Sequence, residues 1–205
     1  MPMKIVPICG SVRPGNYTSR ALAIVLDEFR KYPDVEVSPV DLGTIDLPLP
    51  GRAAGHPSTE QFRQTVKAAT GIVMATPEYH GSFSSVIKLA IENLGFPSVL
   101  AAKPMALLGV AAGQIGAIKS LEHLRSVCSH VGAVVLPSLV SVAQVQQMFD
   151  ENGRCLDART EKQIRSVATT LLDYIKGAVC PRIVLEAMIR RADLSAEGHA
   201  DQMYV

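Results

Sequence analysis

The sequence has no tryptophan, and only 5% of its residues are aromatic. Proteins that bind single-stranded nucleic acid stack the bases on aromatic side chains, and a formal net charge of +1 gives no positive field for a phosphate backbone. We therefore expect no nucleic-acid partner. No apolar run approaches the roughly 20 residues that a bilayer span needs. We expect no signal peptide, no transmembrane helix, no membrane partner and a cytoplasmic location.

Cysteine and glycine motifs are missing as well. The four cysteines form no Cys-x-x-Cys pair and no cluster with histidine at metal-ligand spacing, so we expect reduced thiols and no metal site. Neither G-x-G-x-x-G nor G-x-x-x-x-G-K-[ST] occurs, since Val12 takes the place of the second glycine in the first glycine-containing loop. If this loop binds an anion, the sequence favours a phosphate over a pyrophosphate.

Short apolar runs alternate with helical patterns along the chain. A proline in the first run, Pro7, is unusual for a central strand, because proline cannot donate to the ladder. This alternation predicts a flavodoxin-like α/β fold, a three-layer sandwich around a five-stranded parallel sheet of order 2-1-3-4-5. The predicted domain covers residues 1–180, and residues 181–205 form a C-terminal extension. The predicted strands are residues 4–9, 35–42, 71–75, 104–110 and 133–137.

The chain is organised around residues 77–85, which lie between the predicted strand 71–75 and a helix that begins near residue 86. Ligands bind at the carboxyl ends of the strands in an open α/β sheet. The loops after the first, third and fourth strands meet at that edge, so residues 10–19, 77–82 and 112–116 are expected to form one site. The residues of the second loop are Pro77, Glu78, Tyr79, His80, Gly81 and Ser82.

The first loop has the groups that suit a phosphate monoester. Hydroxyl and amide donors, one guanidinium and the positive end of a helix dipole occur together there. The donors are Ser11, Asn16, Thr18 and Ser19, and the cation is Arg13. In the third loop Gly113 and Gly116 flank Gln114, and glycines allow a flat ligand to approach the backbone closely.

These motifs, in this order, resemble the NADPH-dependent FMN reductase family, which includes flavin, quinone, chromate and azo-dye reductases. The likeness runs from the N-terminus to about residue 176. The motifs that carry it are Gly10-Ser11-Val12-Arg13, Thr18-Ser19-Arg20-Ala21-Leu22, Pro77-Glu78-Tyr79-His80-Gly81-Ser82 and Gly113-Gln114-Ile115-Gly116. The chain departs from the family pattern in three places: His80 for a frequent asparagine, Ser84-Ser85 for Pro-Gly, and Ala112 for a glycine.

The resemblance implies FMN as cofactor and NADPH or NADH as electron donor. It implies that the FMN phosphate binds at Ser11, Arg13, Thr18 and Ser19, and that the isoalloxazine binds at 77–82 and 112–114. Hydride transfer is cofactor chemistry, so no catalytic residue is required; Tyr79 and His80 are candidates. Glu78 is expected to cap the helix that follows this loop or to hold the loop.

The expected activity is hydride transfer from NAD(P)H to FMN and on to a small acceptor, with ping-pong kinetics. The acceptor is a free flavin, a quinone, an azo dye or an oxidised metal ion. Two alternatives remain: a flavodoxin-type FMN electron carrier, and a non-flavin binder of a phosphorylated small molecule. Apolar residues Ile87, Ile91 and Leu94, with segment 142–149, predict a homodimer or homotetramer surface.

Overall fold

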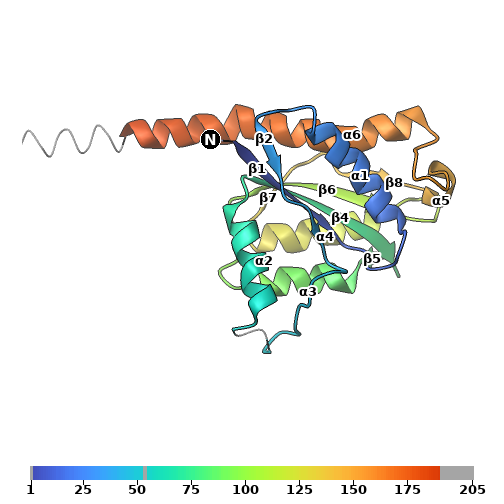
Figure 1. The fold of residues 1–205 in the computed structure, drawn as a ribbon, viewed down its shortest axis with the longest axis horizontal. Helices are drawn as coiled ribbons and strands as arrows, with labels where there is room; N and C mark the ends of the chain where they lie inside the picture. The colour runs from blue at the N-terminus through green and yellow to red at the C-terminus, as the bar shows by residue number, and fades with distance from the viewer. Residues whose placement is uncertain (1, 53–54, 190–205) are drawn as a thin grey trace, which may run out of the picture. The chain divides into compact units, whose positions relative to one another are not determined.

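The computed structural model describes residues 2–52 and 55–189. Its centre is a parallel sheet with strands in the order β2-β1-β4-β6-β7 (Figure 1), in which β2 (Val35–Val37) and β7 (Val134–Val135) are outermost. The three middle strands are β1 (Met3–Cys9), β4 (Gly71–Tyr79) and β6 (Pro104–Val110). They are buried over most of their length, as expected for strands that helices cover on both faces.

The two outer positions of the sheet are each occupied by two short strands. β2 (Val35–Val37) and β3 (Val40–Asp41) both pair with β1, while β7 (Val134–Val135) and β8 (Val140–Val142) both pair with β6. Pro39 and Pro137 lie in the two interruptions, where their missing N–H groups prevent a continuous ladder. The predicted order 2-1-3-4-5 is confirmed, but residues 2–52 and 55–189 form eight strands where five were predicted.

Pro7 is tolerated in this central strand because of the direction that its backbone nitrogen, which has no N–H, faces. The carbonyls of Ile5 and Cys9 accept hydrogen bonds from Ser38 and Leu42 on the neighbouring strand segments. Alternate residues of a strand face the same neighbour, so position 7 faces the interruption between β2 and β3, where no ladder bond is lost.

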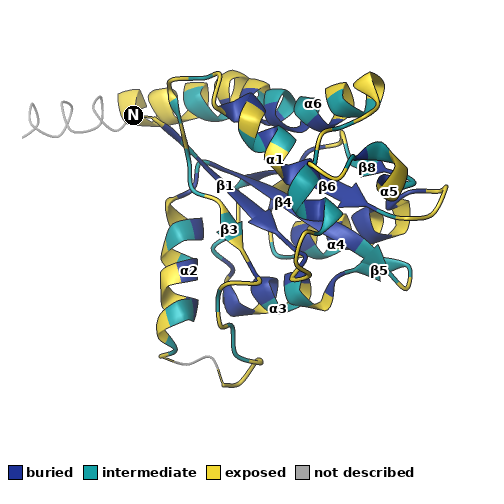
Figure 2. Ribbon diagram, turned by 45° about the vertical axis from the view of Figure 1, so that its right-hand side comes forward, coloured by how far each residue is buried: buried dark blue, intermediate teal, exposed yellow. Residues whose placement is uncertain are grey.

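Helices cover both faces of the sheet (Figure 2). α1 (Tyr17–Phe29) and α6 (Ala158–Tyr174) pack on one face. In this layer the Arg165 guanidinium binds Asp27 and Glu28 of α1 at 2.7 and 3.1 Å. The opposite face carries α2 (Pro57–Ala68), α3 (Ser85–Asn93) and α4 (Ile118–His130).

The core on the α2–α3–α4 face contains the apolar residues on which the oligomer prediction relied. Ile87, Ile91 and Leu94 are between 0 and 4% exposed and pack with Ile72 and Leu107 of the sheet. Val142, Val145 and Phe149 of the second predicted segment are buried too. A stripe of apolar residues on a helix looks the same whether it faces its own core or another subunit, and here it faces the core.

The chain divides into two compact units, Met1–Leu171 and Leu172–Val205. In the second unit residues 175–179 form one π turn, in which Cys180 N–H donates to the Ile175 carbonyl, and residues 180–189 continue as helix. Pro181 has no N–H for the Gly177 carbonyl, which accounts for the widened turn. Of the predicted extension 181–205, residues 190–205 lie outside the described residues.

None of the described helices is both long and apolar enough to cross a bilayer.

Candidate functional site

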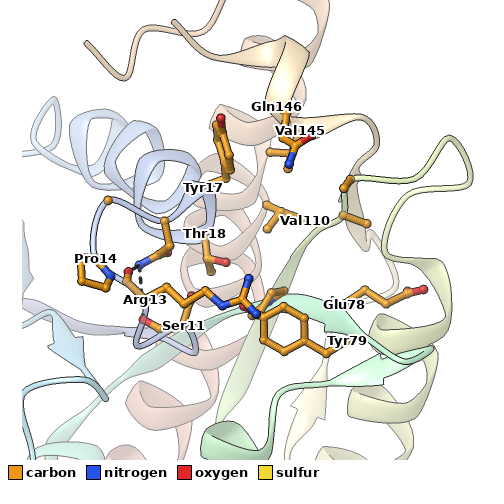
Figure 3. A pocket seen from close by; sticks show the side chains of 15 residues that line it. Ser11, Arg13, Pro14, Tyr17, Thr18, Glu78, Tyr79, Val110, Val145 and Gln146 are labelled. Carbon is orange, nitrogen blue, oxygen red and sulfur yellow. Dashed lines mark hydrogen bonds between the residues drawn. The ribbon is translucent and has the colours of Figure 1, made fainter. Parts of the chain in front are cut away.

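A cavity of about 430 Å³ lies at the sheet edge where β1, β4 and β6 end (Figure 3). It brings together parts of all three predicted loops, which are far apart in the sequence. Its walls are Ser11, Arg13, Pro14, Gly15, Asn16, Tyr17, Thr18, Pro77, Glu78, Tyr79, Val110, Ala111, Ala112, Val145 and Gln146.

Ser11 is the lining residue whose polar group most needs a ligand. The residue is only 3% exposed, and its Oγ has no hydrogen-bond partner among the described residues. A buried hydroxyl without a partner costs roughly 1–3 kcal/mol. Ser11 therefore carries a donor that a bound anion would satisfy. The buried Thr18, in the first turn of α1, lines the same cavity.

Asn16 holds this loop in shape with its whole amide group. Its Oδ1 accepts from Ser19 N–H at 2.7 Å, which caps α1. Its Nδ2 donates to the carbonyls of Arg13 and Ser11 at 2.7 and 3.4 Å. The Ser19 hydroxyl in turn donates to the Asn16 carbonyl at 2.8 Å. Asn16 and Ser19 thus shape the loop, and the remaining N–H groups of the first turn point to the helix N-terminus.

Arg13 and Tyr79 meet across the cavity. The Arg13 Cζ lies 4.8 Å from the centroid of the Tyr79 ring, a cation–π contact that joins the first loop to the second (Figure 3). Arg13 is exposed, so its guanidinium keeps most of its hydration. It is the cation that the sequence placed at this site.

The second loop is more regular than the sequence indicates. β4 continues through Pro77, Glu78 and Tyr79, and the chain returns in β5 (Ser82–Phe83), which pairs antiparallel with β4. The connecting residues His80 and Gly81 both have positive φ, 51° and 74°. This is the geometry of a two-residue hairpin turn. His80 is exposed, and neither turn residue lines the cavity.

Two polar side chains of this loop are engaged with α4. Glu78 Oε2 accepts from Ser120 N–H at 3.1 Å, which caps a helix whose N-cap residue, Ala117, has no capping side chain. Ser82 Oγ lies 3.1 Å from His123 Nδ1. In Figure 3 the Glu78 carboxylate points away from Arg13. Glu78 thus caps α4, a helix 40 residues further along the chain, whereas α3, the helix that follows its own loop, is capped by Ser84.

Ala112 is the residue of the third predicted loop that lines the cavity, whereas Gly113 and Gln114 are exposed and outside the lining. The Gly113 carbonyl accepts from Gly116 and Gln144 N–H groups at 3.2 and 3.1 Å. These bonds tie the third loop to the chain that follows β8.

Sequence reasoning missed a fourth segment that lines the cavity beside the three predicted loops. Val145 and Gln146 belong to α5 (Val145–Met148), directly after β8. The rule that ligands bind at carboxyl ends of strands applies to them too. It was not applied because the fifth strand was predicted to end at residue 137, before β8. Val110 was missed because it was treated as part of the strand alone, and Ala111, the next residue, because the predicted site began at residue 112.

The cavity offers no nucleophilic thiol. The Cys9 Sγ–H lies 3.8 Å from the Ser11 carbonyl, and burial raises the pKa of this thiol, which keeps it protonated at neutral pH. Within residues 2–52 and 55–189 there is also no group of three or more His, Cys, Asp or Glu side chains that would hold a metal ion. The donors present fit a phosphate monoester attached to a larger, partly apolar group.

Comparison with known proteins assigns this arrangement to one group. Residues 3–147 match the family model described as NADPH-dependent FMN reductase. An NAD(P)H-dependent FMN reductase of Pseudomonas aeruginosa is 31% identical over 182 residues, covering 85% of this chain and 96% of that protein. A 2-hydroxy-1,4-benzoquinone reductase of a Burkholderia species is 28% identical over 172 residues, covering 81% and 92%. The flavoenzyme NAD(P)H:(acceptor) oxidoreductase of Paracoccus denitrificans has a TM-score of 0.71 at 21% identity, covering 85% and 98%.

Proposed function

We propose a function from one premise, that this chain belongs to the NADPH-dependent FMN reductase family and is an oxidoreductase using FMN and NAD(P)H. The proposed reaction reduces a small quinone: NAD(P)H, one proton and the quinone give NAD(P)⁺ and the hydroquinone. The similarity to a benzoquinone reductase supports this acceptor class. So does the cavity, whose wall combines the Tyr79 ring with Val110, Ala112 and Val145.

The unsatisfied hydroxyl of Ser11 is the observation that carries the FMN assignment to this cavity. Ser11 is proposed to donate this hydroxyl to the FMN phosphate. The free N–H groups of the first turn of α1, at Tyr17 and Thr18, add donors with the favourable sign of the helix dipole. Arg13 supplies the positive charge, and Asn16 keeps the loop in the shape that aims Ser11.

The second half of the site is proposed to position flat rings. FMN bound there would supply the hydride and electron-transfer chemistry between the nicotinamide and the acceptor. The protein's part is to align the rings and exclude water: Tyr79 forms an aromatic wall, and Pro77 with Val145 closes the apolar sides. His80 and Tyr79 remain candidates for proton delivery, His80 from the turn outside the lining.

Because NAD(P)H and the acceptor are both proposed to bind in the cavity that holds FMN, they are expected to occupy it in turn, which predicts ping-pong kinetics. Initial rates with both substrates varied should give parallel double-reciprocal lines. Converging lines would show that both substrates are bound together and would contradict alternation.

FMN titration of the purified protein, followed by anaerobic NADPH, tests the assignment. The flavin absorption should bleach on NADPH addition and return with a benzoquinone. Binding without bleaching would favour a flavodoxin-type carrier, and no binding would favour a different phosphorylated ligand.

The matched variants are Ser11→Ala and, at the exposed first residue of α3, Ser85→Ala. Loss of a hydrogen bond to a charged group is worth about 1.5–3 kcal/mol. Ser11→Ala should therefore weaken FMN binding by roughly 10- to 100-fold, and Ser85→Ala should leave it unchanged. Equal affinities of the two variants would remove Ser11 from the phosphate site.

A further inference from the structure

Arg13 covers part of the aromatic wall of the cavity. Its Cζ lies 4.8 Å from the centroid of the Tyr79 ring, and both residues line the same cavity (Figure 3). A guanidinium in this position lies on the face of the ring and occupies the surface that another flat group would use. A flat ligand that stacks on Tyr79 from inside the cavity therefore has to displace the Arg13 guanidinium.

Tyr79 is the fixed partner in this contact. It pairs with Ser82 in the hairpin formed by β4 and β5. Two side chains tie this hairpin to α4: Glu78 Oε2 accepts from the Ser120 N–H, and Ser82 Oγ lies 3.1 Å from His123 Nδ1. Because the backbone that carries the ring is tied to a helix, the ring face is uncovered more easily by a movement of Arg13 than by a movement of the hairpin.

The Arg13 side chain is held far less firmly. Its backbone is fixed, since Asn16 Nδ2 donates to the Arg13 carbonyl at 2.7 Å. Its guanidinium, however, forms no hydrogen bond or ion pair within residues 2–52 and 55–189. Glu78, the acidic residue of the cavity lining, points away from it (Figure 3). The ring contact that remains is worth a factor of only about two to five in an equilibrium constant at an exposed site.

A phosphate in the first loop would offer this guanidinium a stronger partner. Ser11, two residues before Arg13, has a buried Oγ without a partner among the described residues, and it lines the same cavity. A hydrogen bond between charged groups is worth roughly 10- to 100-fold in an equilibrium constant. Since this exceeds the value of the ring contact, a phosphate bound at Ser11 would take Arg13 away from Tyr79.

We propose that the Arg13–Tyr79 contact makes the cavity selective for phosphorylated flavins over the same ring system without a phosphate. The inference rests on the proposed FMN site. A ring without a phosphate, such as riboflavin, has to displace Arg13 and offers it no new partner. FMN gives Arg13 a phosphate to bind and gains the uncovered ring face. Arg13 thus discriminates against riboflavin directly, in addition to the attraction that its charge provides for FMN.

Flavin affinities of Arg13→Gln test this inference, because the two flavins should respond in opposite directions. FMN loses a charged contact and should bind roughly tenfold more weakly. Riboflavin no longer has a cation to displace and should bind about two- to fivefold more tightly. Quenching of flavin fluorescence measures both affinities. The matched control is Arg30→Gln, which removes a positive charge at the exposed C-cap of α1, outside the cavity lining, and should change neither affinity.

The two ways in which this experiment can fail are distinguishable. Riboflavin that binds Arg13→Gln no more tightly than it binds the parent, undetected binding included, would overturn the selective role of the Arg13–Tyr79 contact. A parent that binds neither flavin would overturn the FMN assignment, and the selective role with it.

Inorganic phosphate tests the same contact in the parent protein. At a phosphate concentration that weakens FMN binding about tenfold, with ionic strength kept constant by sodium chloride, riboflavin should bind about two- to fivefold more tightly. This gain should be absent in Arg13→Gln and in Tyr79→Leu, which lacks the ring. Phosphate that competes with FMN but leaves riboflavin binding unchanged would overturn the inference. Phosphate that does not compete with FMN would overturn the phosphate site on which it rests.

Discussion

The two segments that meet across the cavity use their polar groups in opposite ways. In residues 10–19 the Asn16 amide is fully used to shape the loop, and one buried hydroxyl, Ser11 Oγ, is left without a partner. In residues 77–83 the side chains of Glu78 and Ser82 turn to α4. The first segment thus leaves one buried hydroxyl available for a ligand, whereas the second uses its polar side chains to hold the scaffold and presents the Tyr79 ring to the cavity. A list of polar residues does not separate these roles, but their hydrogen bonds do.

The largest effect is expected from a substitution at Gly10, where the first segment leaves β1. A Cβ at this position would lie 2.7 Å from the Ala75 carbonyl oxygen and would collide with the Ile87 side chain. Because the backbone oxygen cannot move aside, Gly10→Ala should lower the free energy of unfolding by about 3 kcal/mol and abolish FMN binding with it. Urea denaturation checks this.

Gly113→Ala is the matched control, since a Cβ there meets nothing within 4 Å. It should change stability by no more than about 0.5 kcal/mol. Similar losses in the two variants would mean that glycine is needed for backbone freedom and not for space.

Two substitutions of Asn16 distinguish its role as the cap of α1 from its role in shaping the loop. Asn16→Ala removes the cap of α1 and both loop ties, so it should cost about 1 kcal/mol of stability and roughly tenfold in FMN affinity. Asn16→Ser keeps a cap oxygen but lacks the amide donors to Arg13 and Ser11. It should recover the stability without the affinity, as measured by denaturation and FMN titration. Recovery of both would show that the cap alone shapes the site.

Substitution of Arg13 tests whether the positive charge of the first segment contributes to FMN binding, without disturbing the shape of the loop. Arg13→Gln loses the Tyr79 contact, worth about 0.5–1 kcal/mol at an exposed site, and the cation for the phosphate. FMN affinity should fall about tenfold, and its dependence on salt should flatten because less charge is being screened. Arg13→Lys keeps the charge and should keep the salt dependence. An unchanged salt dependence in Arg13→Gln would place the phosphate away from this residue.

The sequence was sufficient for the sheet order and for placing residues 10–19 at its carboxyl edge, because both depend on local signals. Apolar runs mark the strands, and the first loop follows its strand directly. It was insufficient where a role depends on a distant partner: nothing near Glu78 indicates that its carboxylate caps α4 at Ser120. Nor does an apolar stripe reveal what it faces, which is why Ile87 and Ile91 were assigned to a subunit contact. The strand Val140–Val142 was missed because Pro137 was taken as the end of the sheet.

The smallest effect is expected at the turn of the second segment. His80 has φ 51°, a left-handed conformation that asparagine tolerates better than other non-glycine residues. His80→Asn should therefore raise the free energy of unfolding by a few tenths of a kcal/mol. Since His80 lies outside the cavity lining, quinone turnover should stay within about twofold. A tenfold loss of turnover at unchanged FMN affinity would instead make the imidazole a proton donor. The second segment would then contribute chemistry as well as scaffold.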